Sequence, residues 1–520
     1  MMMKKIKILW TDDEIDLLKP HILFLTDKGY DVVTASNGDD AIDLVKEQNF
    51  DLIFLDENMP GKGGLETLNI LKTFRPNIPV IMITKNEEED IMDAAIGSKI
   101  SDYLIKPVNP KQILLAIKKN LETEELISKE TTSAYQSEFM NLSQDISFAS
   151  DFQAWTSIYK KLVFWELELG NSTDQGLNQV LSMQKNEANN AFSKFIAKNY
   201  LSWFERNKES APLMSPNIFA QKIIPMLDAG EKVFFIVIDN LRYDQWMSLS
   251  KMVYQNYDPA EEALFCSILP TATQYARNAM FAGLMPLEIS KLHPELWVSE
   301  ESDEGKNNYE SQLLQKQLNR LGRNSINMRY EKILNQKTSK KILENYTNLL
   351  NHDLVALVYN FVDMLSHART DMEMIRELAS DEPAYRSLTD SWFRHSDLYT
   401  LLKKLSEEKV KVVITTDHGT IRVHNPIKVV GDKKSSVNLR YKQGRNLNYN
   451  PKEVFEITKP EKAHLPLLNV STSYIFALNN DFMAYPNNYN YYVSYYRNTF
   501  QHGGVSLEEM MTPFIILDPK

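Results

Sequence analysis

Seven side chains of kinds that bind divalent metal ions or act as nucleophiles are spread over more than half of the chain. They are Asp239, Thr273, Asp363, His367, Asp417, His418 and His502. Carboxylates and imidazoles are the usual ligands of catalytic zinc, and a hydroxyl becomes a good nucleophile at neutral pH only when a metal or base activates it. The set contains what two zinc ions and one nucleophile require.

Three parts of this set follow short apolar runs that are typical of buried strands. Asp239 ends the run VFFIVID, Asp363 lies just beyond LVALVYNF, and Asp417 and His418 end VVITTDH. In an open α/β sheet, ligands bind in the crevice beyond the carboxyl ends of the strands. We therefore expect these dispersed positions to converge on one site.

Two further spacings favour metal chemistry. Asp363 and His367 stand four residues apart in DMLSH, so a helix would place them one turn apart on one face. The segment LPTATQYARNAMFAG contains two candidate nucleophiles, Thr271 and Thr273, and the residues alone leave both open. Taken singly, each of these residues is more often structural, since an aspartate at a strand end is usually a helix cap.

In order and type, the set resembles the PglZ branch of the alkaline phosphatase superfamily over residues 218 to 520. This resemblance implies a doubly wound α/β domain with two Zn2+ ions. It assigns one zinc to Asp239, Thr273, Asp417 and His418, and the other to Asp363, His367 and His502. The segment QHGGVSLEEMMTP looks like the family's HGG motif, and the family spacing to Gly283 selects Thr273 as the nucleophile, with Thr271 as a turn residue.

A second group of acidic residues lies near the N-terminus. The apolar run in KIKILWTDDE is followed by Asp12 and Asp13, which suggests a divalent cation site. The runs DVVTA, DLIFLD, PVIMIT and DYLIKP alternate with helical stretches, which predicts a parallel five-stranded α/β domain. Asp56, Thr84 and Lys106 fall at the ends of its third, fourth and fifth strands.

These positions resemble a response-regulator receiver domain of flavodoxin-like fold over residues 1–122. The resemblance implies that Asp56 accepts a phosphoryl group and that Lys106 neutralises it, with Thr84 and Tyr103 as the switch pair. Mg2+ would be held by the set Asp12, Asp13, Asp56 and Asn58, the last through its backbone carbonyl. The alternative is an inert domain of the same fold.

The amino-acid composition limits the kinds of partner that the protein can bind. The chain has 58 basic and 69 acidic residues and a net charge of −11, which argues against a general polyanion-binding surface and direct binding of duplex DNA. The single cysteine, Cys266, suits a reducing compartment, and no apolar run approaches ~18 residues, so we expect a cytoplasmic protein without membrane insertion.

Residues 123–217 carry aromatic and aliphatic residues at helical spacing, as in FQAWTSIYKKLVFWELEL, which predicts an all-α connector domain. Two later segments have alternative explanations. The basic residues Lys428, Lys433, Lys434, Arg440, Lys442 and Arg445 would attract an anionic substrate or form a solvated hairpin. The tract AYPNNYNYYVSYYRNTF would stack nucleobases or form a tyrosine-rich strand.

The order of receiver, helical connector and PglZ-type domain resembles PorX-type response regulators of the type IX secretion system. That resemblance implies a cognate histidine kinase, a homodimer on phosphorylation, and control of secretion through a sigma factor or another regulator. We predict a zinc-dependent phosphodiesterase that acts on short or cyclic oligonucleotides, although a phosphomutase would use the same ligands. The alternative is a non-catalytic dimeric scaffold with a structural zinc site. Arg242, Arg277 and Asn278 are candidate substrate contacts by proximity to the motifs.

Overall fold

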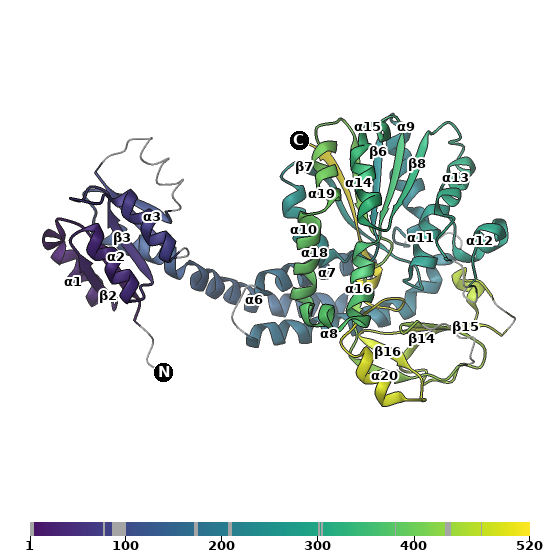
Figure 1. The fold of residues 1–520 in the computed structure, drawn as a ribbon. Helices are drawn as coiled ribbons and strands as arrows, with labels where there is room; N and C mark the ends of the chain where they lie inside the picture. The colour runs from purple at the N-terminus through teal and green to yellow at the C-terminus, as the bar shows by residue number, and fades with distance from the viewer. Residues whose placement is uncertain are drawn as a thin grey trace. The chain divides into compact units, whose positions relative to one another are not determined.

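The computed structural model describes residues 5–75, 78–85, 100–170, 175–205, 211–299, 302, 305–379, 381–431, 438–467, 469 and 471–520 (Figure 1). The chain divides into two compact units, Met1–Ala134 and Tyr135–Lys520. Lys433 and Lys434, which belong to the basic stretch singled out above, lie outside the described residues.

The first unit contains a five-stranded sheet in which all strands are parallel, which confirms the predicted fold. Its order is β2 (Asp31–Ala35), β1 (Lys7–Thr11), β3 (Leu52–Asp56), β4 (Val80–Thr84) and β5 (Asp102–Ile105). Among the described residues, the α-helices that surround this sheet are α1 (Lys19–Asp27), α2 (Gly38–Glu47), α3 (Gly64–Phe74) and α5 (Pro110–Ile117). Alternate strand residues enter separate cores, Leu9 on one face and Trp10 on the other, so helices cover both faces of the sheet.

The predicted connector is helical, but its core is continuous with that of the second α/β region. It comprises α6 (Thr123–Phe148), α7 (Phe152–Gly170), α8 (Gln175–Asn199) and η3 (Tyr200–Phe204). Trp155 and Phe192 lie in one buried cluster with Phe234 of the second sheet. The aromatic stripes of the connector therefore pack against the following domain, and the structure groups residues 135–217 with residues 218–520.

The second α/β region is built on a six-stranded mixed sheet. Its order is β7 (Tyr257–Cys266), β18 (Met511–Pro519), β10 (Lys411–Thr415), β6 (Val233–Ile238), β9 (Leu354–Tyr359) and β8 (Met328–Ile333). β18 runs antiparallel to both of its neighbours, whereas the pairs β10–β6, β6–β9 and β9–β8 are parallel. The predicted doubly wound domain therefore ends, at one edge, in two strands that are antiparallel to each other.

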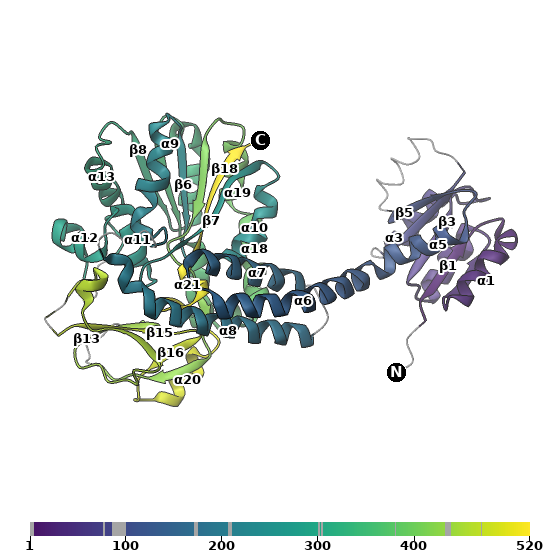
Figure 2. The same ribbon diagram turned by 180° about the vertical axis from the view of Figure 1, so that it is seen from behind.

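Helices cover both faces of this sheet (Figures 1 and 2). Phe235 faces the cluster that contains residues of α9 (Ile224–Asp228), α11 (Thr273–Ala282) and α13 (Glu310–Arg320). Ile236 faces the opposite cluster, with α10 (Tyr243–Val253), α14 (Gln336–Glu344), α18 (Glu382–Arg394) and α19 (Asp397–Leu405). The uninterrupted apolar sequence of β6 follows from this burial on both sides.

A smaller lobe is inserted between β10 and β18. It contains β11 (Ile421–Arg422), β12 (Asn425–Lys428), β13 (Tyr441–Gly444), β14 (Val454–Ile457), β15 (Ser473–Ala477), β16 (Asp481–Ala484), α20 (Tyr489–Tyr496) and β17 (Phe500–Gln501). β11 pairs with β17, and Ile421 lies opposite Gln501. This pairing brings the segment after His418 beside the segment before His502.

One of the two alternatives for the tyrosine-rich tract, the strand, is wrong, and the stacking of nucleobases stays a prediction. The tract forms the helix α20, not a strand, because its tyrosines recur at helical spacing and pack along the helix. Tyr491 stacks on Tyr495 and Tyr492 on Tyr496, each with a ring-centroid distance of 6.2 Å.

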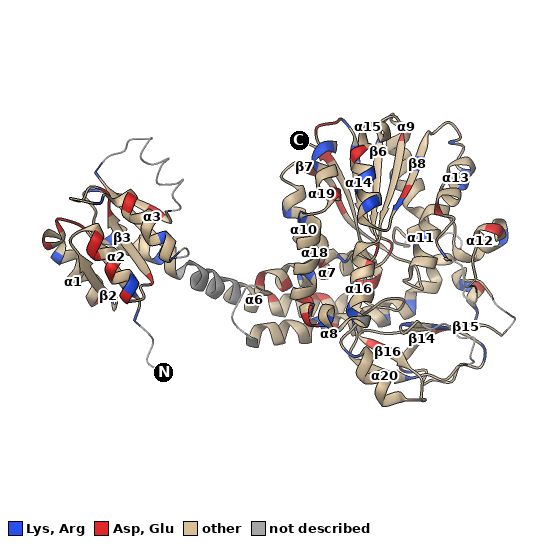
Figure 3. Cartoon of the chain, viewed as in Figure 1, with Lys and Arg blue, Asp and Glu red and all other residues tan. Residues whose placement is uncertain are grey.

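Of the four described basic residues of the stretch, Lys428 and Arg445 are exposed, whereas Arg440 and Lys442 are buried and structural. Arg440 is fully buried and pairs with Glu509, and Lys442 is buried with its ammonium 5.0 Å from the centre of the Tyr485 ring. Neither can form part of a solvated, anion-attracting surface. Acidic and basic residues are also intermixed on helices such as α12 (Pro286–Leu292) and α14 (Figure 3).

Within the described residues, no helix is long and apolar enough to cross a lipid bilayer.

Candidate active site

Three neighbouring strands bring the predicted ligands of the second α/β region together. β10, β6 and β9 lie side by side and run parallel, so their carboxyl ends meet at one edge of the sheet. Asp239 directly follows β6, and Asp417 follows β10 by two residues. Asp363 lies in the first turn of α16 (Phe361–Asp371), the helix that follows β9.

The first cluster consists of Asp239, Asp417 and His418. One ligand atom from each lies within 4.8 Å of the others, and all three side chains are fully buried. Thr273 is the first residue of α11, and its Oγ1 lies 3.1 Å from Nε2 of His418. These are the four residues that the family resemblance assigned to one zinc ion.

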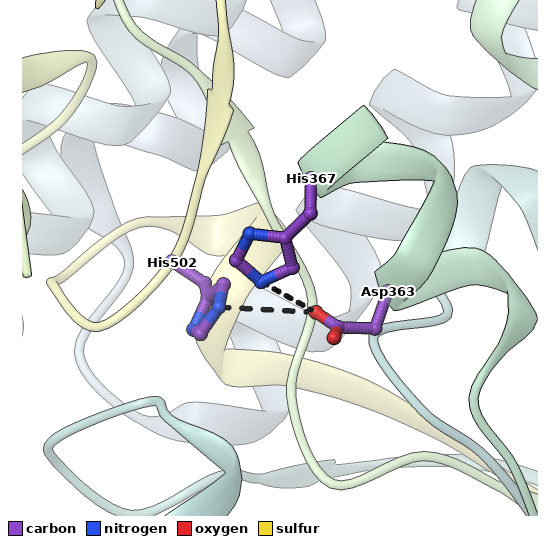
Figure 4. Close-up of side chains that lie close together, drawn as sticks. All are labelled: Asp363, His367 and His502. Carbon is purple, nitrogen blue, oxygen red and sulfur yellow. Dashed lines mark ion pairs between the residues drawn. The ribbon is translucent and has the colours of Figure 1, made fainter. Parts of the chain in front are cut away.

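The second cluster consists of Asp363, His367 and His502 (Figure 4). The Oδ1 atom of Asp363 lies 3.5 Å from Nε2 of His367 and 3.9 Å from Nε2 of His502. The rings of His418 and His502 stack with centroids 4.3 Å apart, which joins the two clusters. The structure thus brings together all seven residues singled out by the sequence.

Two asparagines that the sequence analysis missed orient the carboxylates. The backbone N–H of Asn240 donates to Asp417, and its side-chain amide donates to Asp363, each at 3.3 Å. The Asn360 amide donates to Oδ2 of Asp239 at 2.9 Å. Both asparagines stand beside motif residues at strand ends, the only signal in the sequence that could have identified them. Donors of this kind fix the orientation of carboxylate ligands.

Of the three candidate substrate contacts, only Arg277 reaches a cluster. Its Nη1 lies 2.5 Å from Oδ2 of Asp239 and 3.6 Å from Oδ2 of Asp417, and its Nε donates to Glu310 at 2.6 Å. Arg242 instead pairs with Asp244 and Glu382. The third candidate, Asn278, accepts a hydrogen bond from the side chain of Asn307.

Burial shifts the pKa values of the ionisable groups in this site. Burial raises the pKa of Asp239 to about 6, raises the pKa of Asp417, and raises that of Asp363 well above its usual range. Burial also lowers the pKa of His418 to about 4 and holds that of His502 well below its ordinary value. The neutral imidazoles are available as ligands, and the carboxylates need a cation to remain charged.

The donor atoms fit a pair of zinc ions. Oδ1 of Asp239 and Oδ2 of Asp417 are buried and have no hydrogen-bond partner among the described residues. His502 holds its Nδ1 3.2 Å from the Thr271 carbonyl, which leaves Nε2 directed at Asp363. An imidazole whose second nitrogen donates to a carbonyl is the usual arrangement of a zinc-ligating histidine.

Thr271 has a different environment from Thr273. Its buried hydroxyl donates to the Gly504 carbonyl at 2.9 Å and accepts from the Gly503 N–H at 3.0 Å. Gly503 has φ of +121°, a conformation that favours glycine. Thr271 thereby ties the HGG loop to the start of α11. His424, the other histidine near the motif, hydrogen-bonds through its backbone to Asn480 and belongs to neither cluster.

The receiver unit has its own acidic cluster at the ends of β1 and β3. Asp12, Asp13 and Asp56 present ligand atoms within 4.8 Å of one another, and Nζ of Lys106 lies 2.9 Å from Asp12 and 3.0 Å from Asp56. Burial raises the pKa of Asp56 to about 6, although the hydrogen bond from Lys106 opposes this. Burial also works against the charge on Lys106, but its bonds to Asp12 and Asp56 raise its pKa overall. A divalent cation would relieve the repulsion within this cluster.

One member of the predicted switch pair, Thr84, contacts Glu57, a residue that the sequence analysis overlooked. The Thr84 hydroxyl donates to the Glu57 carboxylate, and the Tyr103 ring is 38% exposed. Asn58 follows β3 by two residues and has an exposed side chain. Glu57 lies next to Asp56 in the sequence, but nothing in its type or spacing marked it as a partner of Thr84.

Three protein-family models match the chain in succession. The model described as "Response regulator receiver domain" matches residues 8–118, "PorX response regulator linker domain" matches 125–204, and "BREX system PglZ alkaline phosphatase-like domain" matches 218–517. The last match covers more than half of the chain, so the chain belongs to the PglZ family of alkaline-phosphatase-like domains. The three matches together have the PorX-type architecture, which confirms the predicted resemblance.

Curated relatives match a shorter part of the chain. The alginate biosynthesis transcriptional regulatory protein AlgB of Pseudomonas aeruginosa is 36% identical over 126 residues, which is 24% of this chain and 28% of AlgB. The transcriptional regulatory protein ResD of Bacillus subtilis is 35% identical over 112 residues, 22% of this chain and 46% of ResD. The chain spans less than half the length of these relatives.

Solved structures similar to the chain include the chemotaxis protein CheY4 of Vibrio cholerae, at 28% identity and a TM-score of 0.22, covering 23% of this chain and 100% of CheY4. A CheY-like receiver domain protein of Methanospirillum hungatei is 27% identical with a TM-score of 0.23, covering 24% of this chain and 98% of that protein.

Proposed function

We propose that this protein is a response regulator whose PglZ domain is a zinc-dependent phosphoric ester hydrolase, with a phosphodiester such as a short or cyclic oligonucleotide as substrate. The observation that carries the proposal is the position of Thr273. Its hydroxyl lies 3.1 Å from Nε2 of His418, a member of the first cluster whose ring stacks on His502 of the second. A structural zinc site would need the ligands but not a hydroxyl in that position.

The proposed zinc ions would be held by two residue sets. The first set is Asp239, Thr273, Asp417 and His418, and the second is Asp363, His367 and His502. When bound, zinc lowers the pKa of a coordinated hydroxyl and offsets the negative charge of phosphoryl oxygens. The Asn240 and Asn360 amides would hold the carboxylates in their binding orientation.

The reaction assigned to the chain has two displacements. The Thr273 oxygen forms a bond to phosphorus as the bond from phosphorus to the first ester oxygen breaks, and the departing alcohol takes up a proton. Water then attacks the phosphothreonine and releases the phosphate monoester and Thr273. Arg277, held by Glu310 and Asp239, lies on the side of Asp417 and supplies a fixed positive charge there.

The receiver would regulate this activity. Asp56 is the proposed phosphoryl acceptor, with Mg2+ at Asp12, Asp13 and the Asn58 carbonyl. A receiver domain implies a histidine kinase partner. Phosphorylation would attract the Thr84 hydroxyl away from Glu57 and allow Tyr103 to turn inward, and a homodimer would follow.

We further propose that the protein acts in the cytoplasm and controls type IX secretion through a sigma factor or another regulator, without binding duplex DNA itself. The net charge of −11 supports the last point. The match to the model described as "PorX response regulator linker domain" supports a PorX-type regulator, and the secretion role follows from the family resemblance stated above.

The test is hydrolysis of bis(p-nitrophenyl) phosphate by zinc-loaded protein. Thr273→Ala should lose at least about a thousand-fold in turnover, because alanine has no oxygen with which to form the covalent intermediate. Thr273→Ser is the matched control, since it keeps a hydroxyl and should retain measurable turnover. Zinc content and thermal unfolding are measured on all three proteins.

Equal turnover by wild type and Thr273→Ala would exclude Thr273 as the nucleophile. No turnover by any of the three, with or without acetyl phosphate, would favour the scaffold with a structural zinc site. In that case, Thr273→Ala should still support secretion in the cell.

A further inference from the structure

Glu310 is a buried carboxylate that lies one side chain away from the first metal cluster. It is the first residue of α13, and 1% of its surface is exposed. Its Oε1 accepts a hydrogen bond from Nε of Arg277 at 2.6 Å. Nη1 of the same arginine lies 2.5 Å from Oδ2 of Asp239 and 3.6 Å from Oδ2 of Asp417. A continuous line of contacts therefore leads from Glu310 to two of the proposed zinc ligands.

The guanidinium of Arg277 is oriented by Glu310 and not by the metal ligands. Its Nη1 is buried and makes no well-formed hydrogen bond among the described residues, although Asp239 lies close to it. Its Nε makes the short hydrogen bond to Glu310. Asp239 and Asp417 thus interact with the arginine through charge, whereas Glu310 also fixes its direction.

Glu310 is itself fixed by a second partner. Its Oε2 accepts from the hydroxyl of Tyr330 on β8, and the Tyr330 ring contacts Phe281 of α11 edge to face, with centroids 5.6 Å apart. Nζ of Lys332 lies 3.8 Å from Oε2, but it donates its hydrogen bond to the Asn307 carbonyl at 3.0 Å. Both oxygens of the carboxylate are therefore held in place.

The charges around Arg277 indicate what Glu310 does for a bound metal ion. Oδ1 of Asp239 and Oδ2 of Asp417 are the buried oxygens that have no hydrogen-bond partner within the described part of the chain. Arg277 lies beside both carboxylates, so its positive charge would repel a zinc ion and compete with it for them. A carboxylate bonded to Nε reduces both effects, because it neutralises the arginine.

We propose that Glu310 is a positioning residue that sets the zinc affinity of the first site through Arg277. It neutralises and orients the guanidinium, so that Asp239 and Asp417 can each present one free oxygen to the metal. The inference deepens the proposed function and rests on it for the identity of the metal site. Mutation of residues that hold metal ligands in this way typically changes metal affinity by about 10- to 100-fold.

The experiment measures the zinc affinity of the full-length protein by competition with a chromogenic zinc chelator. Glu310→Gln keeps the shape of the side chain and removes its charge. It should weaken the binding of one of the two proposed zinc ions by about 10- to 100-fold and leave the other unchanged. Glu310→Asp keeps the charge and should recover part of the lost affinity.

A double-mutant cycle tests whether the effect passes through Arg277. Arg277→Met removes the guanidinium and keeps an apolar stem. In that background, Glu310→Gln should change the zinc affinity by no more than about two-fold. An equal loss with and without Arg277 would show that Glu310 acts independently of the arginine and would overturn the proposal. Wild-type affinity in Glu310→Gln would overturn it as well.

Two further variants separate this effect from a loss of fold, which thermal unfolding measures in every protein. Tyr330→Phe removes one hydrogen bond of Glu310 and keeps every charge, so it should weaken the same zinc ion several-fold, and wild-type affinity would contradict the proposal if Glu310→Gln does not fold. Glu331→Gln is the matched control. Glu331 pairs with Arg329 and points to the face of β8 opposite Tyr330, so this variant should bind zinc like wild type.

The zinc measurement and the hydrolysis assay can fail separately. Turnover by wild type together with unchanged zinc affinity in Glu310→Gln would retain the proposed function and reject the inference. The expected changes in affinity without any turnover would retain the inference and reject the hydrolase. Absence of zinc binding by wild type would reject both.

Discussion

Two acidic sites at strand ends, one in each unit of the chain, differ in how their negative charge is balanced. In the receiver, Asp12 and Asp56 share the ammonium of Lys106, and Asp13 is exposed to water. In the PglZ domain, Asp239 and Asp417 are fully buried. Their cationic neighbour is the buried guanidinium of Arg277, which also forms an ion pair with Glu310 at 2.6 Å.

The difference bears on the two kinds of phosphoryl chemistry that we propose for these strand ends. A lysine is a compact charge on a flexible stem and can move with an arriving phosphoryl group. An arginine with several fixed partners presents its charge in one place. The first arrangement suits the storage of a phosphoryl group that we propose for Asp56, and the second suits the repeated transfer that we propose for Thr273.

The largest expected effect concerns the stored phosphoryl group. Asp56→Asn should abolish labelling of the protein by acetyl phosphate, because an amide cannot form the acyl phosphate. Intact-protein mass spectrometry measures the phosphorylated fraction. Asp39→Asn, at a carboxylate 64% exposed on α2, should label like wild type. Labelling that persists in Asp56→Asn would show that Asp56 is not the phosphoryl acceptor, and the comparison of the two sites would fail.

The next effect concerns the metal sites. Asp363→Asn should reduce bound zinc from two ions to one and lower diesterase turnover by roughly a thousand-fold, because a lost metal removes several kcal/mol of charge stabilisation. Elemental analysis of purified protein gives the zinc content. His424→Gln, outside both clusters, is the control and should bind two ions. Full zinc content in Asp363→Asn would mean that the second cluster is not a metal site.

The smallest of the three effects is on stability. Arg440 and Glu509 are fully buried and form two hydrogen bonds, at 3.1 and 2.7 Å, and Glu509 also accepts from the Gly504 N–H of the HGG loop. Glu509→Gln should lower the free energy of unfolding by about 3 kcal/mol, since it leaves Arg440 charged and poorly paired. Urea denaturation followed by fluorescence measures the change.

The control for this pair is Glu344→Gln. Glu344 pairs with Lys340 across 3.9 Å on the surface of α14, with 62% and 70% of the two side chains exposed. Loss of such a pair should cost less than about 0.5 kcal/mol. Equal losses in the two variants would show that the buried pair does not hold the His502 loop.

The sequence was sufficient to predict the elements on which both sites stand. The strands β6, β9 and β10 are recognisable as apolar runs because they are buried on both faces of the sheet. The polar residue at or just after the end of each run can also be recognised from the sequence alone. The sequence also predicted that these strand ends converge, and the order β10–β6–β9 brings Asp239, Asp363 and Asp417 to one edge of the sheet.

The remaining parts depend on contacts between distant residues, which leave no local pattern. Nothing in the sequence around Arg440 indicates Glu509 as its partner 69 residues later, and a buried ion pair has the same residue types as a solvated one. The hydrogen bond between Arg277 of α11 and Glu310 of α13 likewise joins residues that are 33 positions apart. The tyrosine tract was misjudged because aromatic residues are typical of strands, while here their four-residue spacing lets the rings stack along α20.

The shared core of connector and PglZ sheet determines where this chain can be divided and recombined. A hybrid that joins this receiver to another output domain keeps each core intact if it is cut within α6, ahead of Tyr135. A cut near residue 217, between the matches to the linker model and the PglZ model, would separate Trp155 and Phe192 from the sheet against which they pack. A gene fusion should therefore keep the connector and the PglZ domain together, and the receiver is the part that can be exchanged.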